Sequence, residues 1–238
     1  QDKLLTSERY SAWETVARKL AHEIKNPLTP IQLSIDRLRE KYSSKINEES
    51  KDFENYLQTI NKQIKDIESL VNEFSNFARM PRPVMKKISI NQVIKRAIDL
   101  SKLSSKNEIK FKNVSYSINI SGDEEQLNRV FINLLKNSEE SLNELHDKKP
   151  NYQGKIDIEI IDNNDYIVIR LADNGTGIQD IKKAMTPYYT TKKKGTGLGL
   201  PIVSKIINEH SGEILIRNND GTLIEITLPK YWWAKKYL

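Results

Sequence analysis

MPRPVM, residues 80–85, separates two parts of the sequence that follow different patterns. Two prolines this close together cannot continue a helix, because proline lacks the amide donor and clashes with the preceding turn. Before this stretch, apolar residues recur at helical spacing. After it, short alternating runs typical of strands lie between shorter helical stretches. We therefore predict a helical domain over 1–79, a linker over 80–87, a second domain over 88–230 and a tail over 231–238.

The first part carries two heptad seams. Over residues 4–42 apolar residues recur in steps of three, four or seven, and a second seam runs from Phe53 to Ala78 after the polar segment SSKINEE. Two long amphipathic helices joined by a short polar turn predict a helical hairpin. Two helices alone cannot cover its apolar stripe, so we expect two hairpins to form a four-helix bundle in a homodimer.

One segment of the first helix is unusual. LAHEIKNPLTP, residues 20–30, holds Pro27 and Pro30 inside a helical pattern, where each proline costs ~3 kcal/mol. The heptad frame puts His22 at position f, which points away from the seam. A lone histidine at such a position is usually a solvated surface residue, so position alone gives it no function.

The second part mixes strands and helices without strict alternation. This favours an α+β sandwich with helices on one face of a sheet. The expected strands lie at 109–120, 155–162, 166–173, 212–218 and 222–229, and the expected helices at 91–102, 123–145 and 198–210.

Composition limits the classes of function. Lys and Arg number 38 against 32 Asp and Glu, a net charge of +6, but the lysines are scattered, so no nucleic-acid partner is expected. The absence of cysteine excludes disulfides and thiolate metal sites and agrees with a reducing cytoplasm. No signal peptide is visible, and no apolar stretch approaches the ~20 residues that span a bilayer. We expect this part of the protein not to be embedded in a membrane.

Polar residues at special places suggest a ligand site. Asn133 and Asn137 stand one turn apart in the expected helix over 123–145, although asparagine is a poor residue for a helix interior. Amide oxygens suit Mg²⁺, which keeps several waters and binds nucleotide phosphates. Asp173 ends the expected strand over 166–173, where a carboxylate can meet a ligand.

Two glycine clusters follow. DNGTGI (173–178) comes after a strand, and GTGLGL (195–200) opens a helix, whose N-terminal amides favour phosphate. Either cluster alone is explained equally well by a turn, and neither matches the dinucleotide fingerprint or the P-loop. Between them TPYYTTKKK (186–194) is polar and basic, and we interpret it as a mobile lid over phosphates.

Taken together, these residues resemble the sensor histidine kinase family. His22-Glu23 with Asn26-Pro27 resembles its H box, and NLLKNSEES (133–141) resembles its N box. DNGTGI, PYYTTK and GTGLGL resemble the first glycine box, the F box and the second glycine box. The flanks VARKLAHEIKNPLTPIQLSIDRLREKY and VNEFSNFARMPRP are similar to NtrY-type nitrogen-regulation sensor kinases. The resemblance implies a dimerisation and histidine-phosphotransfer hairpin followed by a Bergerat-fold (GHKL) ATP-binding domain.

For the hairpin, the resemblance implies roles for three residues. His22 would accept phosphate from ATP, Glu23 would take the proton from its other ring nitrogen, and Asn26 would orient water in a phosphatase reaction. Pro27 and Pro30 would kink or soften the helix below the histidine. The phosphate would pass to an aspartate of a response regulator, of NtrX type by the NtrY likeness. The full-length protein would be an inner-membrane sensor with this chain in the cytoplasm.

For the second domain, the resemblance implies a site for ATP and Mg²⁺. Asn137 would hold the metal with support from Asn133, Asp173 would bind the adenine amine, and Lys192 is the lid lysine expected to neutralise phosphate. The further nucleotide-site residues are Gly175, Gly177, Tyr189, Gly195, Thr196, Gly197, Leu198 and Gly199.

Some residues depart from the family pattern. Tyr188 and Tyr189 replace the usual phenylalanines, Ser138 stands where alanine is common, and Glu140 stands where some relatives carry a phosphate-facing lysine. Two histidines, His146 and His210, match no motif and are expected at the surface or in turns. We expect the aromatics of the tail, YWWAKKYL, to cover apolar surface of the ATP domain.

Two rival functions remain open at this stage. ATPases of the MutL or heat-shock chaperone type share the fold but place a glutamate where Asn133 stands, to activate water. An amide cannot act as that base. The other rival is a non-catalytic dimeric scaffold, against which the intact H, N and glycine boxes argue.

Overall fold

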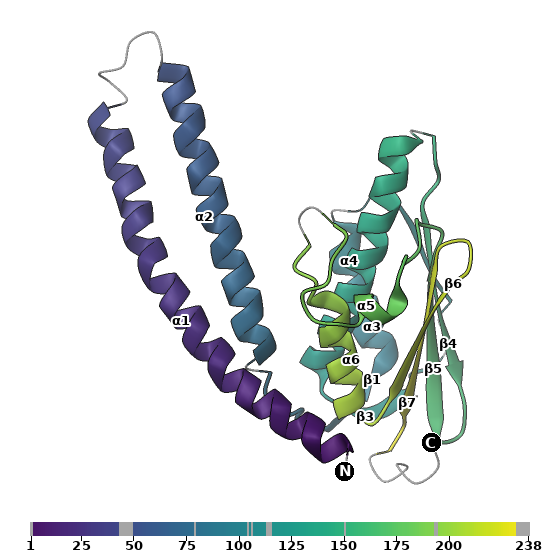
Figure 1. Cartoon of the computed structure of the whole chain (residues 1–238). Coiled ribbons are helices and arrows are strands. Elements are labelled where there is room, and N and C mark those ends of the chain that lie inside the picture. The colour runs from purple at the N-terminus through teal and green to yellow at the C-terminus, as the bar shows by residue number, and fades with distance from the viewer. Residues whose placement is uncertain are drawn as a thin grey trace. The chain divides into compact units, whose positions relative to one another are not determined.

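A computed structural model of the chain describes residues 2–42, 50–78, 80–103, 105, 107–112, 116–149, 151–192 and 195–231. Within the first two helices, the side chains of residues 2–20, 22, 50, 51, 69, 70, 73, 74 and 76–78 are not described. The chain divides into two compact units, Gln1–Pro81 and Arg82–Leu238 (Figure 1).

The first unit is a helical hairpin, as its heptad seams predict. Helix α1 (Asp2–Tyr42) and helix α2 (Ser50–Ala78) lie side by side (Figure 1). Helix α1 continues through Pro27 and Pro30, and its ribbon curves along its length. The polar segment between the helices, residues 43–49, lies outside the described residues.

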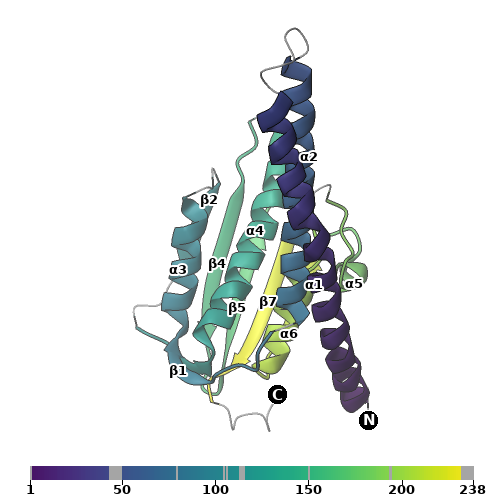
Figure 2. The ribbon, with the colours of Figure 1, turned by 90° about the vertical axis from the view of Figure 1, so that its left-hand side faces the viewer.

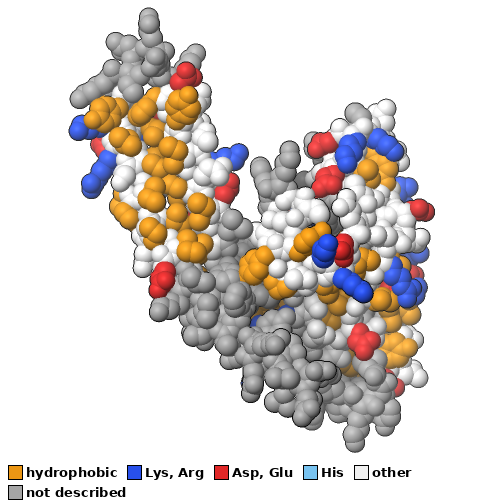
Figure 3. Space-filling model, in the orientation of Figure 1, with side chains coloured by type: hydrophobic (Ala, Val, Ile, Leu, Met, Phe, Trp, Pro, Cys, Tyr) orange, Lys and Arg blue, Asp and Glu red, His pale blue; other side chains and the backbone are white. Residues whose placement is uncertain are grey.

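Each helix of the hairpin carries two neighbouring apolar stripes. One stripe packs between the helices and is buried; its core is Leu28, Ile35, Leu57 and Ile64, with Phe53 packed against it. The other stripe stays 39–45% exposed and consists of Ile24, Ile31, Leu38, Ile60 and Ile67. Figure 3 shows apolar side chains gathered along one face of the hairpin. One chain therefore covers only one of the two stripes, and we call Ile24, Ile31, Leu38, Ile60 and Ile67 the open stripe.

The second unit is an α+β sandwich. Its main sheet has five strands in the order β2-β4-β5-β7-β6. These strands are β2 (Glu108–Lys112), β4 (Lys155–Asp162), β5 (Tyr166–Asp173), β6 (Glu213–Asn218) and β7 (Thr222–Pro229). Helices α3 (Ile90–Lys102), α4 (Glu124–Lys148) and α6 (Gly199–Glu209) lie against one face of this sheet (Figure 2), and a short helix α5 covers Ile181–Ala184. The predicted fold class is confirmed.

The strands differ from the prediction in one place. The run expected as a single strand over 109–120 is two strands in two sheets. Strand β2 pairs in parallel with β4, whereas β3 (Asn119–Gly122) pairs antiparallel with β1 (Lys86–Ser89). Strand β1 begins inside the segment 80–87 that we had predicted as a linker. Strands of four residues have too little alternation to be recognised from their own sequence.

The core lies between the sheet and α4. Alternate residues of the central strands point toward the helices and are buried, among them Ile156 and Ile158 of β4 and Ile167 and Ile169 of β5. The predicted apolar face of α4 is buried against them: Leu127, Val130, Phe131, Leu134, Leu135 and Leu142. Burying each such side chain stabilises the fold by ~1.5–3 kcal/mol. This packing fixes the rotation of α4 and therefore the directions of its polar residues.

No helix in the described part of the chain is long and apolar enough to cross a membrane.

Candidate nucleotide site

The start of α4 is held by Asp123. One carboxylate oxygen, Oδ1, accepts hydrogen bonds from the amides of Glu125 and Gln126, both at 3.1 Å. The other oxygen, Oδ2, accepts from the amide of Val84 at 2.8 Å. Burial would raise the pKa of Asp123, but these amide donors hold the pKa below its ordinary value. The capped helix is thereby tied to the segment that leads out of the hairpin.

Asp123 is also tied to the end of α6, through His210. The His210 imidazole nitrogen Nε2 accepts a hydrogen bond from the Asp123 amide at 2.9 Å. The other ring nitrogen, Nδ1, donates to the Ile206 carbonyl at 2.8 Å. His210 is only 3% exposed, and burial lowers its pKa. It occupies a turn, one of the two places expected for it, and its side chain is buried there. A helix terminus packed onto another helix terminus buries it, and sequence carries no signal for that contact.

His146 is also less exposed than expected. It is half-buried in the last turn of α4, and its Nε2 lies 2.9 Å from Asn107 Oδ1.

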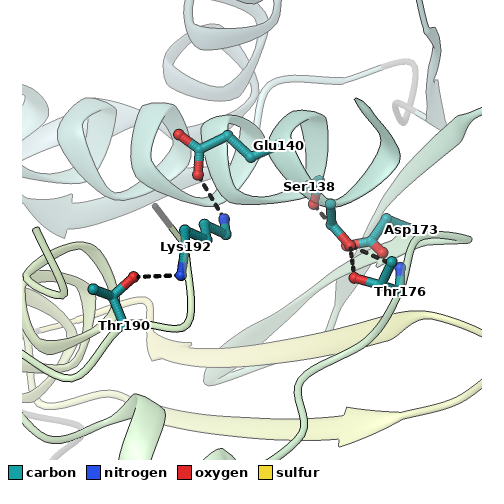
Figure 4. A network of polar contacts seen from close by, with 7 residues as sticks. Ser138, Glu140, Asp173, Thr176, Thr190 and Lys192 are labelled. Atoms are coloured by element: carbon teal, nitrogen blue, oxygen red, sulfur yellow. Dashed lines mark hydrogen bonds and ion pairs between the residues drawn. The ribbon is translucent and has the colours of Figure 1, made fainter. Parts of the chain in front are cut away.

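At the end of β5, Asp173 is buried and accepts hydrogen bonds from three donors, of which Ser138 is labelled in Figure 4. Its Oδ1 accepts from the amides of Gly175 at 2.9 Å and Thr222 at 3.2 Å, and its Oδ2 accepts from the Ser138 hydroxyl at 2.8 Å. A Cβ at position 175 would lie 2.9 Å from Asp173 Oδ1, so only glycine lets the loop amide come this close. The register of β5 with β7 places Thr222 opposite Asp173. Three chain elements thus converge on one carboxylate.

A second hydroxyl of α4 holds the same loop. Ser141 Oγ accepts from the Thr176 amide at 2.8 Å and lies 3.0 Å from Thr176 Oγ1. Sequence reasoning did not single out Ser138 or Ser141 as site residues. The signal that could have found them is two serines three residues apart on the apolar, buried face of a helix.

The two asparagines of α4 face the start of α6. A Cβ on Gly199 would lie 3.5 Å from Asn133 Oδ1 and 3.6 Å from Asn137 Nδ2. Asn133 Nδ2 donates to the Arg129 carbonyl at 2.8 Å. The Asn137 carboxamide has no hydrogen-bond partner among the described residues. The structure therefore brings both N-box asparagines beside the helix N-terminus that the second glycine cluster opens.

This donor set suits Mg²⁺ with a phosphate ligand. Within the described residues, no three His, Cys, Asp or Glu cluster as a protein-only metal site would require. The Asn137 amide oxygen is available for a hard cation, which would complete its shell with water and phosphate oxygens.

The predicted lid packs on the second glycine cluster. The Tyr188 amide donates to the Gly197 carbonyl at 3.1 Å, and Tyr188 and Gly197 both have positive φ, 69° and 68°. A Cβ at Gly197 would lie 2.6 Å from the Tyr189 carbonyl oxygen, so glycine is required there. The centroid of the Tyr189 ring lies 6.0 Å from Lys183 Nζ, and Leu198, within the cluster, is buried.

Elsewhere in the lid, Lys192 contacts α4. Its Nζ lies 2.5 Å from Glu140 Oε2, one turn beyond Asn137 (Figure 4). The Lys192 amide donates to Thr190 Oγ1 at 3.1 Å and the Gly195 amide donates to the Lys192 carbonyl at 3.2 Å. The lysine expected to meet phosphate thus lies near Asn137 but is paired with a carboxylate of α4. Residues 193 and 194 lie outside the described residues.

Comparison with known proteins decides the family. Residues 12–83 match the His Kinase A (phospho-acceptor) domain, and residues 122–231 match the histidine kinase-, DNA gyrase B- and HSP90-like ATPase family. Over 95% of its length the chain is 41% identical to an NtrY-like sensor histidine kinase of Rickettsia prowazekii and 36% identical to the nitrogen regulation protein NtrY of Azorhizobium caulinodans. The chain belongs to the sensor histidine kinase family.

The matched region is part of longer relatives. The chain spans 37% of the Rickettsia protein and 30% of the Azorhizobium protein. The histidine kinase ThkA, solved in complex with the response regulator protein TrrA, has the same fold. It aligns with 94% of this chain and 64% of its own, with a TM-score of 0.61 at 24% identity.

In this histidine kinase the H box lies on α1. Glu23 and Asn26 are exposed on the helix, as is Pro27. The side chain of His22 lies outside the described residues, and its orientation stays a prediction. The same holds for the aromatic tail from residue 232 onward; Tyr231 before it is exposed.

Proposed function

We propose that this histidine kinase transfers the γ-phosphoryl group of ATP to His22 and then to an aspartate of a response regulator. The observation that supports this most directly is the arrangement along α4. One edge presents Asn133 and Asn137 to the start of α6, and the adjoining face presents Ser138 to Asp173. A nucleotide bound with its base at Asp173 and its phosphates at Asn137 fits this arrangement.

The chain's own groups would bind the two ends of the nucleotide. Asp173 would accept a hydrogen bond from the adenine amine. The amides that open α6 would donate to phosphate oxygens, because a helix N-terminus favours anions. Asn137 and water would hold Mg²⁺, which would neutralise charge on the phosphates. Release of Lys192 from Glu140 would add a cation on the lid side.

Phosphoryl transfer would depend mainly on placing His22 in line with the γ-phosphorus of ATP. A ring nitrogen of His22 attacks the γ-phosphorus in line, an N–P bond forms, the bond to the bridging oxygen breaks, and ADP leaves. Glu23 takes the proton from the other ring nitrogen, which keeps the attacking nitrogen nucleophilic.

The partners proposed are a second copy of the chain and a response regulator. The open stripe supports the homodimer, since its five side chains need a second hairpin to be covered. The ThkA–TrrA complex supports a response regulator as a binding partner, and the NtrY likeness favours an NtrX-type regulator. Asn26 would orient water when the kinase removes phosphate from that regulator. In the full-length protein this chain would be the cytoplasmic part of an inner-membrane sensor.

Both rivals fit less well. A water-activating ATPase needs a base at position 133, and here an amide is held by the Arg129 carbonyl. A scaffold without activity would not need the Asn137 carboxamide, which has no hydrogen-bond partner among the described residues, beside the N-terminus of α6.

The test is incubation with Mg²⁺ and ATP radiolabelled on its γ-phosphate. We expect label on the protein that is lost in acid and stable in base, as a phosphoramidate is. A parallel incubation with excess EDTA should give no label. Absence of label with Mg²⁺, or label stable to acid, would contradict the proposal.

A further inference from the structure

The hydroxyl of Ser138 has an unusual hydrogen-bond acceptor for a serine inside a helix. A serine inside a helix can bond to the carbonyl four residues earlier. Ser138 Oγ instead donates across to Asp173 Oδ2 at 2.8 Å, at a position only 2% exposed. The family resemblance leads us to expect alanine at this position, so packing alone does not require the hydroxyl.

The donors around Asp173 leave little of its carboxylate open. An ionised carboxylate offers about four acceptor positions, two on each oxygen. The amides of Gly175 and Thr222 occupy both positions on Oδ1, and Ser138 occupies one on Oδ2. One acceptor position is left, and its direction is set by the other three.

Without the hydroxyl this direction would be less defined. The final side-chain torsion of aspartate is broad, so two amides on a single oxygen leave the other oxygen room to move. Ser138 also follows Asn137 directly in α4. The same helical turn therefore sets the carboxylate that faces the base and the amide that faces the phosphates.

We propose that Ser138 is a positioning residue for the base of the nucleotide, acting through Asp173. By fixing the open acceptor position it makes the site favour a purine with a 6-amino group, which donates, over one without it. The inference rests on the proposed function, in which Asp173 meets the adenine amine.

The test measures two nucleotides on two proteins. ATP and purine riboside triphosphate, which has hydrogen in place of the amine, are titrated with Mg²⁺ into the full chain by calorimetry. The wild type should bind ATP more tightly. Ser138→Ala should weaken ATP binding about tenfold, ~1.4 kcal/mol, and change the affinity for the analogue less than twofold.

A matched variant separates positioning from general loosening. Ser141→Ala removes another buried hydroxyl from the same face of α4, but one that bonds to Thr176 and not to Asp173. It should change the affinities for both nucleotides by the same factor. Thermal unfolding of both variants checks that they fold, and alanine is a good helix residue at either position.

Each remaining outcome decides against one claim. If Ser138→Ala weakens the binding of both nucleotides equally, or keeps the wild-type preference for ATP, the positioning role of Ser138 is wrong. The hydrogen bond from the adenine amine to Asp173 is then still supported. If the wild type itself binds both nucleotides equally, the reading of the amine by Asp173 fails, and the inference falls with it.

Discussion

The hairpin and α4 both carry long apolar stripes, but a single chain buries the stripe of α4 and leaves the open stripe of the hairpin exposed. Leu127, Phe131 and Leu135 of α4 are at most 1% exposed, because the sheet of the same chain covers them. On the hairpin the open stripe keeps 39–45% of each side chain exposed. The second unit therefore covers its own apolar faces, whereas one hairpin leaves an apolar stripe exposed. The proposed functions divide in the same way: the proposed nucleotide residues lie in the second unit, and the H box lies in the hairpin.

The largest expected effect tests this division of function. His22→Ala should abolish phosphate incorporation completely, because the variant lacks the imidazole proposed as the phosphate acceptor. ATP affinity should change less than twofold, since the nucleotide residues belong to the other unit. Radiolabel incorporation and calorimetry measure the two quantities. Label at the wild-type level would remove His22 as the acceptor.

Asn137→Ala should act on the second unit alone. We expect Mg-ATP affinity to fall at least tenfold, ~1.4 kcal/mol or more, and autophosphorylation to stop. The hairpin dimer should be unaffected. The control is Asn143→Ala, an exposed asparagine of the same helix. Because alanine raises helix propensity at both positions, unchanged affinity for both variants would show that the metal role is wrong.

The open stripe can be broken with one charge. Ile31→Glu should raise the dimer dissociation constant about a hundredfold, ~2.7 kcal/mol. In a two-fold symmetric dimer the substitution places a charged side chain on both hairpins at the same apolar interface. Leu33→Glu is the control, since Leu33 is more exposed, at 54%, and lies off the open stripe. Light scattering across a dilution series measures the effect. A wild-type chain that is monomeric at micromolar concentration would contradict the bundle.

Asn26→Ala should separate two reactions of the hairpin. We expect dephosphorylation of a purified phospho-regulator to slow about tenfold, ~1.4 kcal/mol of barrier, while autophosphorylation changes little. The physical reason is that a carboxamide one turn beyond His22 can donate to and accept from water without being a base. Equal losses in both assays would favour a merely structural asparagine that satisfies the backbone before Pro27.

The smallest effect concerns pH and His210. Burial holds the pKa of His210 below 6.5 in the folded state, so the unfolded chain binds the proton first. Stability should therefore fall as pH drops through about 6.5 toward the lower folded pKa, and level off beyond it. Thermal unfolding of residues 82–238 in this window should show a shallower pH slope for His210→Gln. An equal slope for both proteins would exclude His210 as the cause.

How much of this was readable from sequence depends on the range of the interaction. The apolar face of α4 and the strand ending at Asp173 follow local spacing and were predicted from it, and the boxes were identified by their resemblance to the family. Strands β1 and β3, the burial of His210 and the Lys192–Glu140 pair depend on contacts between segments far apart in sequence. Ser138 is an intermediate case. Its departure from the pattern was visible, but only the fold shows that its hydroxyl reaches Asp173.

The two carboxylate oxygens of Asp123 bond to different parts of the chain. Oδ1 accepts hydrogen bonds from the first turn of α4, and Oδ2 accepts one from the amide of Val84. Because the two oxygens bond to different segments, loss of the Val84 bond would leave both bonds to the first turn of α4 in place, and such a helix cap is typically worth ~1 kcal/mol. The conformation of the segment around Val84 can therefore change without uncapping the helix that carries Asn133 and Asn137.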